Sequence, residues 1–321
     1  MKKSSKLAAL VLALAMILSL CACSGKESKV YQVGISQYVT HPALDAATQG
    51  FIDAMNDKLG EDGWTYDLQN AAEDIPTCGT IANSFVAKNV DLIMANATPA
   101  LQAAATATGD IPILGTSVTE YGVAFNISDF NGTVGGNISG TSDLAPLDQQ
   151  AEMIKEWYPE AKTIGLLYCS KEANSQYQVD TVQGYLEDMG YTCKQYAFSD
   201  SNDIQAVCQT ASDNSDVLYV PTDNSAAANT PIIDNICRGV TPVFAGEEGI
   251  CSGCGVATLS ISYYDIGYKT GEMAAEILLN GADISTMPIQ YAPEFVKKYN
   301  PTICEALNIT VPDGYEALAQ D

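Results

Sequence analysis

The sequence is poor in histidine and in basic residues, and both shortages limit its chemistry. Its 321 residues include one histidine, and 15 Lys and Arg face 39 Asp and Glu, which gives a net charge of −24. No more than two basic residues stand side by side, so the basic patch of a nucleic-acid-binding protein is missing. The Gly-x-Ser-x-Gly and Gly-x-Gly-x-x-Gly motifs are absent too, which removes the usual serine-hydrolase and dinucleotide signatures. The residues therefore predict neither a cofactor nor a nucleic-acid partner.

The first residues have the composition of an export signal. Lys2, Lys3 and Lys6 precede an apolar core, residues 7–20, that is too short for an ordinary membrane span. The following Leu-Cys-Ala-Cys string resembles a bacterial lipobox, and Cys23 fits it better than Cys21 because small Ala22 precedes it. We expect residues 1–22 to be a lipoprotein signal peptide, Cys23 to carry the lipid, and residues 23–29 to form a tether. A plain secretory signal is the alternative.

Eight cysteines follow Cys23, and an exported chain can join such residues in disulfides. Their scatter does not fix a pairing. Cys251 and Cys254 are the closest pair, and the glycines around them indicate a tight turn, which favours a local disulfide. Two free thiols, or metal or redox chemistry, are the alternatives. Because a zinc site needs a second Cys-x-x-Cys or paired histidines, we predict no metal centre.

Short apolar runs alternate with segments of helical length, first over residues 30–120 and again over residues 143–261. The runs are typical of strands buried on both faces of a parallel sheet. Between them apolar residues recur at helical spacing, as Leu44, Phe51 and Met55 do. Glycine-rich residues 121–140 separate the two series. This order predicts an α/β protein with two similar lobes, each a parallel sheet between helices.

Hydroxyl residues end two neighbouring strands of the stretch Asp91–Glu120. Thr98 follows the first apolar run, and Thr116 and Ser117 follow the second. In open α/β sheets the ligand crevice lies at the carboxyl ends of the strands. We therefore expect these side chains to hold the carboxylate of a small ligand.

The same stretch predicts a helix start that would assist them. Thr98 has the character of an N-cap, with Pro99 at the first helical position. The amides of Ala100 and Leu101 would then be free to face an anion. A helix cap with no ligand is the alternative interpretation of Thr98.

An α-amino acid also needs an acid for its ammonium group. Asp223 and Glu247 each follow a predicted strand of the second series and are the first candidates. A helix cap competes with this role for Asp223, and a solvated loop charge competes with it for Glu247. For Asp143 a capping role leads over lining a hinge or binding the ammonium.

Further candidates lie at other strand ends and loops. Those of the first series are Ser36, Gln37 and Asn70. Those of the second series are Glu172, Asn174, Ser175 and Asn224, for which helix capping is again the alternative. Candidate aromatic partners for a ring are Tyr38, Tyr121 and Tyr177. His41 precedes Pro42 at a helix start, where a cap or a cleft rim is favoured over catalysis.

Six strings occur in an order known from one family. They are Val33–Asp45, Ala97–Ala100, Gly140–Leu144, Glu172–Ser175, Val220–Asn224 and Tyr263–Gly267. Together they resemble the TrpX-like solute-binding lipoproteins of ABC importers, over nearly the whole mature chain. The loop Gly246–Cys254 departs from the Ser/Asp-rich loop of common members.

The resemblance implies a type I periplasmic-binding-protein fold, with two Rossmann-like lobes joined by three hinge crossings. Lobe 1 would hold residues 30–142 and 262–283, and lobe 2 residues 143–261 and 284–321. The crossings would fall near Gly140–Thr141, Ile261–Ser262 and Asp283–Ile284.

The resemblance also implies a function. An extracytoplasmic, lipid-anchored monomer would bind a small amino acid, an aromatic one favoured, in the cleft between its lobes. It would deliver the solute to the permease and ATPase subunits of an ABC importer, and it would not be an enzyme. The alternatives are a sensor lipoprotein that presents its solute to a signalling partner, and an exported α/β enzyme.

Overall fold

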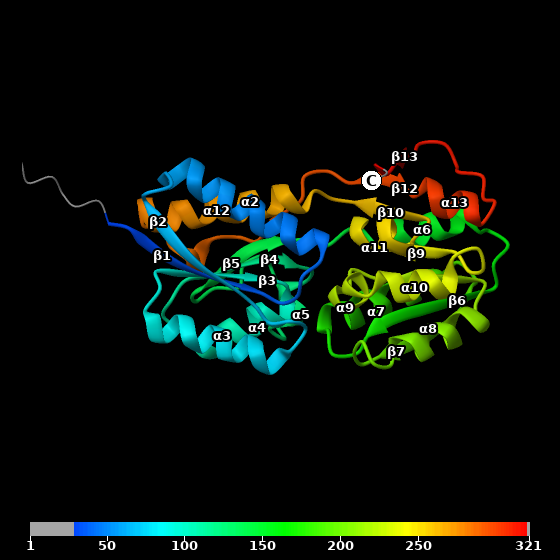
Figure 1. Ribbon diagram of the computed structural model, residues 1–321, viewed down its shortest axis with the longest axis horizontal. Helices are drawn as coiled ribbons and strands as arrows, with labels where there is room; N and C mark the ends of the chain where they lie inside the picture. The colour runs from blue at the N-terminus through cyan, green and yellow to red at the C-terminus, as the bar shows by residue number, and fades with distance from the viewer. Residues whose placement is uncertain (1–28, 320–321) are drawn as a thin grey trace, which may run out of the picture.

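Residues 29–319 are described by the computed structural model, and they form two lobes that lie side by side (Figure 1). The expected signal peptide and Cys23 lie outside the described residues. Each lobe is built on one sheet that helices cover on both faces. None of the helices between residues 29 and 319 combines the length and the apolar character that a membrane span needs.

The first sheet has six parallel strands in the order β11-β5-β4-β3-β1-β2. They are β1 (Tyr31–Gln37), β2 (Trp64–Asn70), β3 (Leu92–Asn96), β4 (Ile113–Val118), β5 (Ile138–Ser142) and β11 (Gln290–Tyr291). Every residue of β3 and β4 is buried, which explains their continuous apolar runs. The helices are α2 (Pro42–Leu59), α3 (Ile75–Lys88), α4 (Thr98–Ala107), α5 (Tyr121–Ala124) and α12 (Tyr263–Asn280), with the 3₁₀ turn η2 (Ile284–Thr286).

The second sheet has seven strands in the order β13-β12-β10-β9-β8-β6-β7. They are β6 (Thr163–Cys169), β7 (Thr192–Phe198), β8 (Val217–Val220), β9 (Val243–Ala245), β10 (Ala257–Ser260), β12 (Val296–Tyr299) and β13 (Glu316–Ala317). All neighbours are parallel except β10 and β12. The helices are α6 (Leu147–Trp157), α7 (Ala173–Asp188), α8 (Ile204–Asp213), α9 (Asn224–Ala228), α10 (Thr230–Cys237), α11 (Glu248–Cys254) and α13 (Pro301–Ala306).

The late helix α12 returns to the first lobe and packs along α2 on one face of the first sheet, while α3 and α4 cover the other face (Figure 1). Two glycines allow this close approach. A Cβ on Gly267 would collide with the backbone carbonyl of Ala47, and one on Gly50 would collide with that of Tyr264. The packing of the late helix α12 against α2 in the first lobe therefore requires glycine at positions 50 and 267.

The chain passes between the lobes three times. It leaves the first lobe after Ser142, returns between Ser260 and Tyr263, and leaves again after Tyr291. The third crossing is therefore later than the expected Asp283–Ile284. Residues 284–291 stay with the first lobe, because β11 pairs with β5 and Ile284 is buried in a core cluster of that lobe.

Candidate functional site

The segments that follow the strands of the two sheets meet between the lobes. In the first lobe β1, β3, β4 and β5 are consecutive neighbours, with Gln37 beside Asn96, Asn96 beside Thr116, and Val118 beside Ser142. Neighbouring strands lie about 4.8 Å apart. The residues that end these strands therefore form a row at one edge of the sheet, which faces the second lobe.

Four polar atoms in this row lack partners. The hydroxyls of Ser36 and Ser117, the Oδ1 atom of Asn96 and the Oδ1 atom of Asp143 are buried, and no described residue hydrogen-bonds to any of them. A buried polar atom without a partner costs about 1–3 kcal/mol. Since such atoms are rare and several of them here lie along one edge of the sheet, the row has the character of a site prepared for a polar ligand.

The backbone of the row is strained at two non-glycine residues. Ala97, directly after β3, has φ +87°, and Ser117 in β4 has φ +53°. Conformations of this kind cost of order 1–3 kcal/mol each and cluster at functional sites. At Ser117 the pairing of β4 with β5 also shifts register, between Gly115 and Val118. The irregular backbone thus coincides with the unpartnered hydroxyls.

The start of α4 differs from the prediction by one residue. Ala97, not Thr98, is the N-cap, and its carbonyl accepts the amide of Leu101 at 3.1 Å. The Leu101 amide is therefore already used, contrary to expectation, and the free amides of the first turn belong to Thr98 and Ala100. The buried Thr98 hydroxyl has no hydrogen-bond partner within residues 29–319. The helix start still offers donors to an anion.

Thr116 and Gln37 are not among the free groups. The Thr116 hydroxyl lies 3.2 Å from that of Thr141, which lies 2.9 Å from the hydroxyl of Thr270 in α12. The Gln37 side chain donates to Asp45 at 2.6 Å and accepts from Thr48 at 2.7 Å, both in α2. These two side chains join the sheet to its covering helices.

Asn70 lies away from the row. It is exposed, donates to the Thr40 hydroxyl at 3.0 Å, and accepts the amide of Ala72 at 2.8 Å. Its position at the end of edge strand β2 suits a turn, and the structure gives it no free atom in the site.

The two acids that we expected to bind an ammonium group both cap helices. Asp223 accepts the Ala226 amide at 2.8 Å at the start of α9, and its second oxygen accepts the Cys169 amide at 2.6 Å. Glu247 accepts the amides of Ile250 at 2.5 Å and Gly249 at 2.6 Å at the start of α11. Burial raises the pKa of Asp223 to about 8, assisted by the charge of Glu172, and raises that of Glu247 to about 7.

Glu172, Asn174, Ser175 and Asn224 form one network with α9. Glu172 accepts the Ser225 amide at 2.9 Å and the Asn224 side-chain amide at 2.6 Å. Asn174 donates to the Thr222 carbonyl at 3.1 Å and lies 3.4 Å from the Ser175 hydroxyl, while its own Oδ1 is buried without a partner. Helix capping thus accounts for Glu172, whereas Asn174 leaves one acceptor free.

Asp143 is the acid that remains. It caps no helix, because α6 begins at Leu147 with Pro146 as its N-cap. Its Oδ2 accepts the Tyr263 hydroxyl at 3.0 Å, and its Oδ1 has no partner among the described residues. Burial raises the pKa of Asp143 to about 6. A cation beside Oδ1 would favour the charged carboxylate and lower this pKa again.

His41 joins the two lobes. Its Nε2 lies 3.3 Å from Oδ1 of Asn224, and both side chains are buried. Asn224 must turn its amide nitrogen toward Glu172, because a carboxylate only accepts, so its oxygen faces His41. We therefore assign the proton to Nε2, which leaves Nδ1 as a buried acceptor without a partner. Burial lowers the pKa of His41 to about 4.

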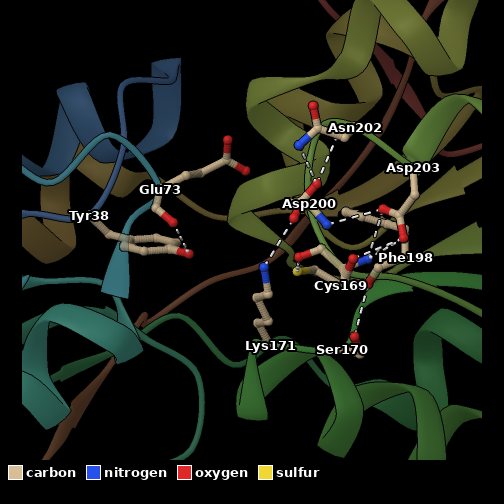
Figure 2. Close-up of polar contacts among 10 residues, drawn as sticks. Tyr38, Glu73, Cys169, Ser170, Lys171, Phe198, Asp200, Asn202 and Asp203 are labelled. Atoms are coloured by element: carbon tan, nitrogen blue, oxygen red, sulfur yellow. Dashed lines mark hydrogen bonds and ion pairs between the residues drawn. The ribbon is translucent and has the colours of Figure 1, made fainter. Parts of the chain in front are cut away.

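Glu73 is a residue of this interface that the sequence analysis missed. Figure 2 shows Tyr38 and Glu73 on the first lobe, opposite Lys171, Asp200 and Asn202 on the second. The Tyr38 hydroxyl donates to the Glu73 carbonyl at 3.1 Å, and Lys171 pairs with Asp200 at 3.1 Å. Burial raises the pKa of Glu73, the nearby Ser225 side chain of the other lobe lowers it, and the buried Glu73 Oε1 has no partner among residues 29–319. Its loop position after β2 was the available signal, but its left-handed φ of +65° was not visible in the sequence.

The three candidate aromatic residues have different settings. Tyr38 and Tyr121 are almost fully buried, and the Tyr121 hydroxyl donates to the Thr141 carbonyl at 3.0 Å. Tyr177 is half-buried on α7, where burial and then the charge of Glu120 of the first lobe raise its pKa. Of the three, Tyr177 therefore has a side chain at the lobe boundary that is not wholly enclosed.

The Cys251–Cys254 prediction is wrong in both its parts. The two residues lie in helix α11 rather than in a tight turn, and both thiols are free. The Cys254 thiol donates to the Ile250 carbonyl at 3.3 Å, as a buried helical thiol can.

A cavity of about 1080 Å³ lies beside the second and third crossings, between α2 and α12 on one side and α11 on the other. It reaches Thr141, Glu247 and Tyr263 but not the row of unpartnered atoms. Since Tyr263 bonds to Asp143, the cavity approaches the candidate site from the hinge side.

Comparison with known proteins places this architecture. Residues 32–321 match the family model "ABC transporter substrate binding protein". The chain belongs to that family. It is 38% identical over 286 residues to a "Tyrosine-binding protein" of Clostridioides difficile, which covers 88% of this chain and 82% of that protein. The family is one of solute-binding proteins, and the two lobes have the type I periplasmic-binding-protein fold expected above.

Two solved structures, one with a ligand and one without, overlap with this chain to different extents. The ABC domain of a Streptococcus pneumonia protein in complex with L-Trp is 30% identical, with TM-score 0.85, over 90% of this chain and 100% of that one. The ligand-free, open structure of a Clostridium difficile substrate binding protein is 38% identical, with TM-score 0.68, over 91% and 100%. The overlap of this chain is thus greater with the L-Trp complex, although its sequence is the less similar of the two.

Proposed function

We propose that this protein binds a free amino acid between its lobes, with an aromatic one favoured, as the solute receptor of an ABC importer. Asp143 carries the proposal, because it is a fully buried acid with one unpartnered oxygen, whereas Glu73, whose Oε1 also lacks a partner, is only partly buried. An ammonium group beside Oδ1 would supply the missing partner and keep the carboxylate charged.

The carboxylate of the same ligand would face the neighbouring strand ends. The unpartnered Ser117 hydroxyl, the Thr98 side chain and the first amides of α4 can all donate to it. The ammonium and carboxylate of an amino acid are bonded to one carbon. Asp143 follows β5 and Ser117 lies in the neighbouring strand β4, about 4.8 Å away, so this acceptor and this donor match the two charges when each contact is about 2.8 Å long.

An aromatic ligand is supported by the relatives. One is named for tyrosine and one was solved with L-Trp. The greater overlap of this chain with the L-Trp complex fits closure over a ligand of that size. His41–Asn224 and Glu73–Ser225 would then stabilise the closed state directly.

A ligand panel tests the proposal. Isothermal titration would compare L-tyrosine, L-tryptophan and L-phenylalanine with tyramine, which lacks the carboxylate, and with 3-(4-hydroxyphenyl)propanoate, which lacks the ammonium group. We expect at least one intact amino acid to bind and both truncated compounds to bind at least 30-fold more weakly than L-tyrosine or not at all. Binding of a sugar, with no response to any amino acid, would contradict the proposed site.

The importer role and the anchor need separate measurements. We propose delivery to a permease and ATPase and attachment outside the cell through a lipid on Cys23. Uptake of the labelled amino acid should fall when the gene is deleted and return with the wild-type copy. Mass spectrometry of the exported protein should find a lipid-modified N-terminal Cys23. Unchanged uptake would favour the sensor alternative, and an unmodified N-terminus would favour a plain secretory signal.

A further inference from the structure

Two buried cysteines of the second lobe lie in contact. Cys208 on α8 and Cys237 at the end of α10 have their sulfur atoms 3.8 Å apart, and both side chains are almost fully buried. This is the one sulfur–sulfur hydrogen bond among residues 29–319. The two cysteines are 29 residues apart in the sequence. The Cys251–Cys254 motif, which suggests a disulfide in the sequence, makes no contact between its sulfur atoms.

We infer that Cys208 and Cys237 are a disulfide site, closed by thiol–disulfide exchange when the protein is exported. The sulfur atoms of a disulfide are about 2.05 Å apart, so closure requires them to approach by about 1.8 Å, which small side-chain rotations on two packed helices can supply. From the proposed function, the inference uses only that the chain leaves the cytoplasm. Disulfides persist in the oxidising environment outside it.

A second contact joins α8 to the segment that follows α10. The Ser212 hydroxyl on α8 lies 2.7 Å from that of Thr241, four residues beyond Cys237, and both are buried. Helices α8 and α10 also pack against each other along the same face of the second sheet (Figure 1). The pair of thiols is therefore held in register by contacts that do not involve sulfur.

The reaction balances with a disulfide oxidant. Cys208 and Cys237 give up two protons and two electrons and form one S–S bond, while the S–S bond of the oxidant breaks and yields two thiols. The oxidant is a small disulfide or the oxidised form of a thiol–disulfide oxidoreductase. The thiol contact, and then burial, hold the pKa of Cys237 well above its ordinary range. Because only the thiolate attacks, exchange is fastest before the second lobe has packed.

The crosslink would enclose part of the candidate site. Residues 208–237 contain β8 and the start of α9 with Asp223, Asn224 and Ser225. Asn224 and Ser225 donate hydrogen bonds to Glu172, and Asn224 also contacts His41 of the first lobe. A bond that closes this segment restricts the unfolded chain, and it stabilises the second lobe without touching the row of free atoms in the first.

A thiol count on the full chain, exported from a bacterial host with its own leader, tests the inference. The protein is purified without reductant, alkylated with N-ethylmaleimide in denaturant, digested and analysed by mass spectrometry. We expect one crosslinked peptide pair containing Cys208 and Cys237, and alkylation at the other described cysteines. A second sample, refolded with reduced and oxidised glutathione, should give the same pair. Complete alkylation of Cys208 and Cys237 in both samples, or a crosslink to any other cysteine, would overturn the inference.

Two variants provide the controls. Cys208→Ser should abolish the crosslink and leave the Cys237 thiol alkylated, whereas Cys251→Ser, also buried in the second lobe, should keep it. Reduction of the wild type should lower its melting temperature by roughly 5–10 °C, and reduction of Cys208→Ser should change it by less than 2 °C. Equal shifts in the two proteins would refute the crosslink even if a variant folds poorly, because each is compared with itself. Ligand titration of the oxidised protein tests the proposed function independently.

Discussion

Replacing Asp143 by asparagine removes the charge that we assign to the ammonium of the ligand while keeping the shape of the side chain. The Asp143 carboxylate is buried, accepts the Tyr263 hydroxyl at 3.0 Å, and has one free oxygen. A hydrogen bond between charged groups contributes about 1.5–3 kcal/mol, which corresponds to a roughly 10- to 150-fold loss of affinity. We therefore expect Asp143→Asn to weaken binding of L-tyrosine or L-tryptophan, whichever binds the wild type more tightly, by that factor.

The deaminated analogue separates this effect from damage to the fold. Asp143→Asn should bind 3-(4-hydroxyphenyl)propanoate as tightly as the wild type does or more tightly. In the wild type the Asp143 carboxylate repels the carboxylate of this analogue, which has no ammonium group to separate them, and the substitution removes that repulsion. Asp148→Asn, an exposed acid in the first turn of α6, is the matched control and should leave both affinities within twofold. Isothermal titration at pH 7 measures all six values. Equal losses for the amino acid and the analogue, or no loss for either, would refute the assignment.

Three further predictions follow from the same geometry. Burial holds the pKa of His41 at about 4, below its ordinary 6.5, so ligand affinity should fall as the pH drops through this range, together with the loss from protonation of Asp143, whose pKa is about 6. His41→Gln, which can still donate to Asn224, should make the fall less steep, and identical profiles would exclude the His41 effect. Glu247→Ala should lower the free energy of unfolding in urea by about 1 kcal/mol through loss of the α11 cap, yet change ligand affinity less than threefold; a loss like that of Asp143→Asn would restore Glu247 as the cation site. Ala97→Gly should raise the free energy of unfolding by about 0.5–1 kcal/mol, because glycine accepts φ +87° without strain, whereas Ala100→Gly inside α4 should lower it by about 1 kcal/mol; a loss in both would contradict the strain argument.

The two-lobed α/β fold could be predicted because its signals are local. Continuous apolar runs such as β3 and β4 and the helical spacing of Leu44, Phe51 and Met55 follow directly from burial. Residues 289–291 do have the character of a short strand, but the sequence does not indicate its sheet: β11 has two residues and belongs to the first sheet because β5 offers an edge to pair with. This is why the third crossing was placed too early.

The site was predicted correctly at the level of strand ends, but the roles of its acids depend on where helices begin. In the sequence, Asp223 and Glu247 have the positions expected of acids that bind a ligand. In the structure they accept the first amides of α9 and α11 instead. Asp143 looked like a cap, yet Pro146 disfavours helical geometry in the residue before it and shifts the start of α6 to Leu147. That signal was present in the sequence and would have freed Asp143 for the ligand.

Side-chain direction within a strand was less accessible. Thr116 and Ser117 are adjacent and chemically similar, but Thr116 faces Thr141 and α12, while the hydroxyl of Ser117 stays free. The register shift of β4 and the left-handed backbone of Ser117 set this difference, and both arise from pairing with β5. Pairing of this kind is a property of the assembled sheet.

A crystal structure of the complex with the tightest-binding amino acid tests the central claim most directly. The account predicts the ammonium nitrogen about 2.7–2.9 Å from Oδ1 of Asp143 and the carboxylate within hydrogen-bond distance of Ser117, Thr98 or the first amides of α4. It would be contradicted by an ammonium group bound to Asp223 or Glu247 with α9 or α11 left uncapped, or by a ligand seated wholly in the cavity between α11 and α12.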